Sequence, residues 1–269
     1  MTPEEIEPRL ADAFRLLQDE IDSSLFCPRN GFALEHVPLM VMSRVLRLGL
    51  AICHLVKGGF YGEAFGLTRS VLEAFFIVKY ISTRDSEKRA QSYLDYTEAY
   101  YFNQEEIRKR YFPHIPRPEW ITQELLDRVK QRFGANPRKW VAAHNMAAEY
   151  YDHPAEIDAA TGKGYQALSD YDGMYEMTSH YVHVTAFSTR GNYYASPLKC
   201  ARQDADEDRG ILALYFSLAY CLQICIMLGR AWDVVLANSV TQTILDLLSE
   251  LRTATSVNKS GVWGVPKTP

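Results

Sequence analysis

The sequence lacks the short motifs by which several kinds of reactive site are recognised. It contains no Cys-x-x-Cys pair, no His-Glu-x-x-His, no Glu-x-x-His and no Gly-x-Ser-x-Gly. These absences exclude the usual signatures of a paired-cysteine site, a helix-borne zinc site, a di-iron bundle and a hydrolase nucleophile turn. We therefore expect neither a bound metal nor a cofactor.

The chain also lacks an excess of positive charge and a signal peptide. Its 269 residues have a formal net charge of −4 and a pI near 6.0, so the chain as a whole does not attract nucleic-acid backbones. The N-terminus is acidic and amphipathic, unlike a secretory signal, and five cysteines, an odd number, suit a reducing compartment. We expect a cytoplasmic protein, with RNA binding an open but disfavoured role.

Alternating strand patterns are almost absent, and helical patterns run through most of the chain. Periodicity, caps and breakers predict helices over about 3–23, 39–57, 61–82, 86–110, 119–133, 137–151, 165–187 and 211–252. The expected fold class is all-α, a single bundle of eight to ten helices. It should span residues 1–253, followed by a loosely ordered tail over 254–269.

Residues 211–229 are an uncharged stretch of 19 residues. That length could cross a bilayer. The stretch includes Ser217 and Gln223, however, and a helix that is apolar all round also suits the centre of a bundle. We expect the helices at 211–229 and 61–82 to form the centre of the fold, without a membrane.

Two of the predicted helices place polar side chains among apolar ones. Arg69 and Glu73 are one turn apart on the first helix, and Ser179 and His183 are one turn apart in the segment YEMTSHYVH. Because a buried charge is costly unless it is paired, we expect these four side chains to meet as one polar cluster. A histidine oriented by a carboxylate can move protons near neutral pH, which makes all four candidate catalytic residues.

Two alternatives remain open for this region. His180 and Tyr175 are secondary candidates, and Glu176, His180 and His183 share a helix face that could bind a metal, although no metal motif supports this. The other interpretation is structural: Arg69 pairs with Glu73, and the histidines bond to carbonyl or tyrosine hydroxyl groups.

Tyrosines and a short basic segment precede the proline-rich break after residue 110. Tyr93, Tyr96 and Tyr100 share one helix face, which is more typical of core or interface packing than of base stacking. The segment EEIRKRYFPHIPRP is the best local basic patch in the chain. Runs of this kind are usually only solvated.

Three segments together resemble a known family. They are GGFYGEAFGLTRSVLEAFFIVKYI, PRKWVAAHNMAAE and YDGMYEMTSHYVHVTAF. The first has an Arg-x-x-x-Glu arrangement, and the third has Tyr, Tyr, Ser and His at four-residue spacing. Over roughly residues 30–235 the chain is similar to the bacterial family catalogued as domain of unknown function 5677. The resemblance implies an all-helical cytoplasmic protein with no established activity, and its recurring polar positions are Arg69, Glu73, Tyr171, Tyr175, Ser179 and His183.

Some proteins of this kind look like the helical ribonucleases called HEPN, in which an arginine is followed by a histidine after four to six residues. Arg47–His54, Arg108–His114 and Arg138–His144 have this spacing, and one or two such matches are expected by chance. Arg138 and His144 are therefore secondary candidates. Two function classes follow: a non-enzymatic helical binding protein, expected to be a homo-oligomer, or a HEPN-like ribonuclease or other hydrolase acting through His183 or His144.

Overall fold

The computed structural model of the chain describes residues 3–22, 33–134, 141, 143, 145–147, 171–182, 207–232 and 237–254. Within these residues the chain forms nine helices and no strand, which confirms the predicted all-α multi-helix fold. The helices are α1 (Pro3–Asp22), α2 (Ala33–Lys57), α3 (Tyr61–Thr83), α4 (Ser86–Tyr111), α5 (Gln123–Phe133), η2 (Tyr171–Tyr175), α8 (Glu176–Val182), α10 (Glu207–Trp232) and α11 (Asn238–Ala254).

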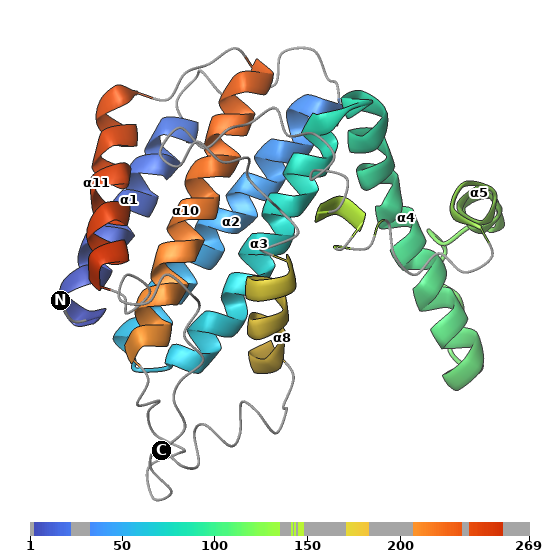
Figure 1. The fold of residues 1–269 in the computed structure, drawn as a ribbon. Coiled ribbons are helices and arrows are strands. Elements are labelled where there is room, and N and C mark those ends of the chain that lie inside the picture. The colour runs from blue at the N-terminus through green and yellow to red at the C-terminus, as the bar shows by residue number, and fades with distance from the viewer. Residues whose placement is uncertain are drawn as a thin grey trace, which may run out of the picture.

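The centre of the bundle consists of α2, α3 and α10, with α1 and α11 packed along one side (Figure 1). Helix α3 is apolar on both sides, so it can be surrounded by other helices. Phe65 and Phe75, which point in different directions around it, are both buried, and the Phe75 ring lies 5.1 Å from the Tyr220 ring of α10. The predicted central position of these two helices is confirmed.

Two of the described helices, at Ala33–Lys57 and Arg209–Gly229, are long and apolar enough to cross a membrane. Both are core helices of the bundle, and 67% of the most apolar window of the second is buried. Inside that window the Ser217 hydroxyl donates to the Leu214 carbonyl at 3.0 Å. Burial against α2 and α3 therefore accounts for the apolar composition of α10.

The prediction of one helix over 211–252 was wrong, because α10 ends at Trp232 and α11 begins at Asn238. A single helix of that length would extend about 63 Å, far beyond the neighbouring helices. By turning back, α11 buries Ile244, Leu247 and Leu251 against α10 and α1. The backbone amide of Ala237 at the new start donates to Glu20 of α1 at 3.2 Å.

Helix α2 begins at Ala33, six residues before the predicted start at residue 39. The first amides of a helix need an acceptor from elsewhere. Here the carboxylate of Glu87 on α4 accepts from the Ala33 amide at 2.8 Å and from the Leu34 amide at 2.9 Å. A cap supplied from 54 residues away leaves no local signal, so the predicted start, directly after Pro38, is too late.

The distal half of α4 and the whole of α5 project away from the bundle (Figure 1). We call residues 95–134 the arm. Helix α5 starts at Gln123 rather than at the predicted residue 119, because the Thr122 hydroxyl caps it by accepting from the Leu125 amide. The arm has a hydrophobic cluster of its own, formed by Ala99, Phe102, Ile121, Leu126 and Val129.

Candidate functional site

Helix α8 lies against α3 because a glycine lets the two helices approach closely (Figure 1). A Cβ atom added at Gly66 would lie 3.3 Å from the Cβ of Tyr181, so a larger side chain would push α8 outward. One residue away, the Phe65 and Tyr181 rings meet edge to face at 5.6 Å. This contact fixes the position of α8 along the axis of α3, and it therefore determines which polar residues of the two helices face each other.

One turn further along, Arg69, Glu73 and Tyr175 form a closed triangle of hydrogen bonds. Arg69 Nε donates to Glu73 Oε1 at 3.2 Å, and Arg69 Nη2 donates to the Tyr175 hydroxyl at 2.8 Å. The Tyr175 hydroxyl donates to the same Glu73 oxygen at 2.9 Å. We call this triangle the α3–α8 network. It brings together two primary candidates and one secondary candidate from the sequence.

The surroundings of the α3–α8 network keep the phenol of Tyr175 protonated. Burial raises the pKa of Tyr175, and the carboxylate of Glu73 raises it further. The Arg69 guanidinium also lies over the Tyr175 ring, 4.6 Å from its centre. With side-chain exposures of 20% for Arg69 and 40% for Glu73, the network is half-buried.

The Ser179 hydroxyl is directed into its own helix, since it donates to the carbonyl of Tyr175. This bond satisfies the hydroxyl locally. His180 is half-buried on the same helix. The remaining candidates, His183, Arg138 and His144, lie outside the described residues, so their proposed roles stay predictions.

The placement of Tyr175 depends on a turn that sequence periodicity does not reveal. Residues Tyr171–Tyr175 form a π-helical turn, η2, directly before α8. Such turns are rare in proteins as a whole, and those that occur often lie at functional sites. The turn stacks the Tyr171 and Tyr175 rings at 4.7 Å. Four-residue spacing placed Tyr175 on the same helix face as Ser179. It gave no reason to expect that the Tyr175 phenol, and not the Ser179 hydroxyl, would bond to Arg69 and Glu73.

No metal centre is visible in the part of the chain that the structure describes. Within that part, no three His, Cys, Asp or Glu side chains come close enough to bind one ion. Of the residues proposed as ligands, Glu176 is exposed and His180 is half-buried, and His183 is not described.

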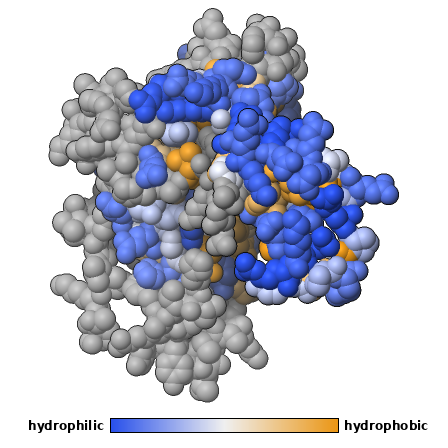
Figure 2. Space-filling model, turned by 90° about the vertical axis from the view of Figure 1, so that its right-hand side faces the viewer, coloured by the Kyte–Doolittle hydropathy of each residue, from blue (hydrophilic) through white to orange (hydrophobic). Residues whose placement is uncertain are grey.

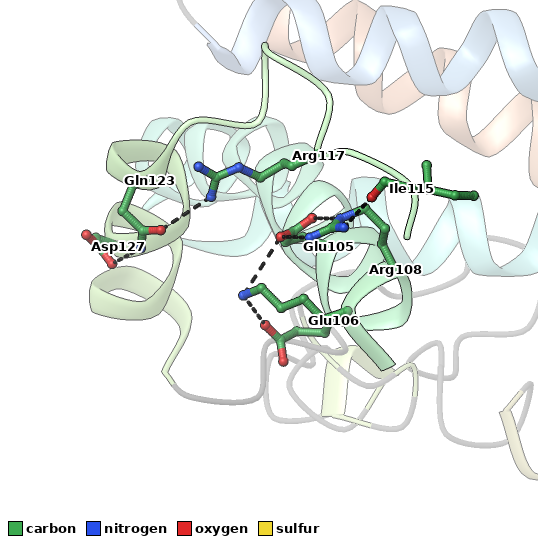
Figure 3. A network of polar contacts seen from close by, with 8 residues as sticks. Glu105, Glu106, Arg108, Ile115, Arg117, Gln123 and Asp127 are labelled. Carbon is green, nitrogen blue, oxygen red and sulfur yellow. Dashed lines mark hydrogen bonds and ion pairs between the residues drawn. The ribbon is translucent and has the colours of Figure 1, made fainter. Parts of the chain in front are cut away.

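Sequence reasoning missed a second polar network, which lies on the arm (Figure 3). The Glu105 side chain is buried and accepts from Arg108 at 2.6 and 2.9 Å. Arg108 also donates to the carbonyl of Ile115, which ties the linking segment to α4. Hydrogen bonding to Arg108 lowers the pKa of Glu105. The i, i+3 spacing was visible in the sequence, but nothing in that spacing showed that Glu105 is buried.

Replacing Tyr175 with phenylalanine should lower the free energy of unfolding by about 1 kcal/mol. The variant loses the hydrogen bonds to Arg69 and Glu73, which still contact each other. Urea unfolding measures the change. Thr243→Val is the control, because it also removes a hydroxyl and Thr243 is exposed on α11, away from both the network and the arm. An equal loss in both variants would mean that the network adds nothing to stability.

Comparison with protein families gives one match. A family model described as a family of unknown function, DUF5677, matches residues 35–195. The match covers more than half of the 269 residues, and it includes both the α3–α8 network and the arm. It confirms the resemblance drawn from the three sequence segments. No curated protein and no solved structure matches the chain.

Proposed function

The chain belongs to the DUF5677 family of unknown function, and we propose that it is a non-enzymatic interaction module whose contact surface is the arm. In this proposal the α3–α8 network has a structural role and fastens α8 to the bundle. Its support is that the phenol proton of Tyr175 is donated to Glu73, while Arg69 bonds to both partners.

The observation that carries the proposal is the exposure of apolar side chains on the arm. Twelve large hydrophobic side chains are exposed in the part of the chain that the structure describes, and six of them lie between residues 100 and 120. Their exposed fractions range from 44% to 62%. The six are Tyr100, Ile107, Tyr111, Phe112, Ile115 and Trp120. Gathered apolar exposure of this kind marks contact surfaces.

The aromatic residues of the arm are partly continuous with one another. The Tyr100 and Tyr101 rings lie 5.8 Å apart, and the Tyr101 and Trp120 rings 4.6 Å apart. Figure 2 shows the side of the molecule that carries the arm, where hydrophilic residues cover most of the described surface and hydrophobic ones emerge between them. Aromatic side chains within a polar surround are typical of the core and rim of an interface.

The charges of the arm favour a protein partner over a nucleic acid. Residues 95–134 hold seven Asp or Glu and seven Lys or Arg, so their formal charges sum to zero. Several cations are paired in addition: Arg108 with Glu105, Lys109 with Glu106, Arg128 with Glu98 and Arg132 with Asp95. An arm without net positive charge has little attraction for a phosphate backbone.

A cytoplasmic location belongs to the same proposal. Cys53, Cys221 and Cys225 are free and buried, as expected where thiols stay reduced. Burial raises the pKa of Cys53 to about 12, which makes this thiol unreactive at neutral pH.

Photo-cross-linking in cells tests the contact surface. A benzoylphenylalanine is introduced at Tyr100, and in a separate chain at Leu245 of α11, which is also exposed. We expect covalent adducts, identified by mass spectrometry, from the first position and not from the second. Adducts at neither position, or equally at both, would contradict the proposal.

A further inference from the structure

We infer that the arm binds the arm of a second copy of this chain, through the face of α4 that points away from α5. The inference rests on the proposed function, since it names the partner of the same surface. It follows from the geometry of α4, the symmetry of its exposed residues, the charge of the arm and the area of its aromatic rings.

Three exposed residues form a stripe along α4. At 100° per residue, Tyr100, Ile107 and Tyr111 point within about 40° of one another. Phe102, which belongs to the cluster with Leu126 of α5, points about 160° away from Tyr100. Helix α5 therefore covers the Phe102 side of α4. At one end it also reaches Tyr96, whose ring meets Phe133 of α5, but all three side chains of the stripe stay exposed.

The order of residues in the stripe is nearly the same when it is read in either direction. A tyrosine stands at each end, and an isoleucine lies between them. A two-fold dimer requires a surface that complements itself. When two α4 helices pair antiparallel about residues 105 and 106, Tyr100 of one chain lies opposite Tyr111 of the other. Ile107 then lies opposite Gln104, whose side chain is exposed.

The distribution of charge favours self-association through the arm. The formal charges of the arm sum to zero, and those of the whole chain sum to −4. Residues outside the arm therefore carry the entire net charge of −4. Two copies that met through their bundles would repel each other, whereas two arms would not. A strongly acidic or basic partner, in contrast, gains no attraction from a neutral arm.

The exposed aromatic area matches what a stable dimer needs. The stripe supplies Tyr100 and Tyr111, and Phe112 and Trp120 lie elsewhere on the arm; all four are about half exposed. A fully buried aromatic side chain covers about 150–250 Å², so these four rings present roughly 400 Å². A standard interface buries about 800 Å² per partner, of which a little more than half is apolar. The four rings together approach that apolar share, so the inferred contact extends from the stripe to Phe112 and Trp120.

Sedimentation equilibrium of the full chain tests the inference. We expect a dimer of the 30.7 kDa chain at micromolar concentration. Ile107→Glu should raise the dimer dissociation constant at least tenfold, because it places one carboxylate from each chain inside the contact between the two stripes. The control is Leu245→Glu on α11, which should remain dimeric, and circular dichroism should give the same helix content for all three proteins.

A second measurement tests the arrangement without changing the stripe. Gln104→Cys should be joined to its copy in the partner by a short bismaleimide, because the antiparallel pairing brings the two positions together. Gln242→Cys on α11, also exposed, should not be joined. A monomeric wild-type chain would overturn the inference, and so would cross-linking that Ile107→Glu does not reduce. If Tyr100 then cross-links to another macromolecule in cells, the proposed function stands without this partner.

Discussion

Replacing Phe75 with alanine is expected to lower the free energy of unfolding by about 3–5 kcal/mol. Phe75 is fully buried on α3, and its ring contacts Tyr220 of α10 and Phe76 of its own helix. Truncation leaves a cavity between the two central helices, which cannot collapse without moving the whole bundle. Equilibrium unfolding in urea, followed by far-ultraviolet circular dichroism, measures the loss.

The matched control is Phe60→Ala, because Phe60 lies outside the arm and is 43% exposed. It removes the same side chain without opening a cavity, so the free energy of unfolding should change by no more than about 0.5 kcal/mol. Comparable losses for the two variants would show that α3 and α10 are not the centre of the folding unit.

Replacing Glu105 with glutamine is expected to open the arm while the bundle stays folded. The buried carboxylate accepts two hydrogen bonds from Arg108, and a neutral amide cannot replace that pairing. Amides of α5 should exchange with deuterium about tenfold faster in the variant, the factor that corresponds to roughly 1.4 kcal/mol. Hydrogen exchange read by mass spectrometry compares α5 with α10 in the same sample.

The pH dependence of the same contact has a definite sign. Hydrogen bonding to Arg108 lowers the pKa of Glu105 in the folded chain. The stability that the Glu105–Arg108 contact contributes is therefore fully present above the usual glutamate pKa of about 4.3. It is lost as the pH falls through the lowered pKa of Glu105. Exchange in α5 should accelerate in this acid range before exchange in α10.

Glu106→Gln is the control for both experiments. Glu106 is the next residue, it is exposed, and its ion pair is with the exposed Lys109, so little should change. A Glu105 variant with the exchange rates of the Glu106 variant would show that the buried contact does not hold the arm together.

The centre of the fold was predictable because composition alone determines it. Residues 211–229 carry no charge and residues 61–82 are apolar on both sides apart from a few charged residues, and a bundle interior accommodates such helices in water. Helix ends were less predictable where the cap comes from a distant element. The start of α2 depends on Glu87 and the start of α11 on Glu20, and neither residue is a neighbour in sequence.

The candidate site was predictable only as far as helical spacing extends. Four-residue spacing gave the contact between Arg69 and Glu73, and burial cost gave the need for a partner on another helix. It did not single out Tyr175, because the π-helical turn before α8 changes the direction of the side chains that precede it. The buried Glu105 was missed because helical spacing gives no signal of its burial.

Helix α4 passes from the bundle into the arm as one uninterrupted segment of 26 residues. It is about 39 Å long, and its first turn is held to α2 through the Glu87 carboxylate. The arm is therefore joined to the bundle by a continuous helix whose first turn is fixed to α2, and not by a flexible linker. A force applied near Tyr111 therefore acts through α4 on the Glu87 bonds that cap α2.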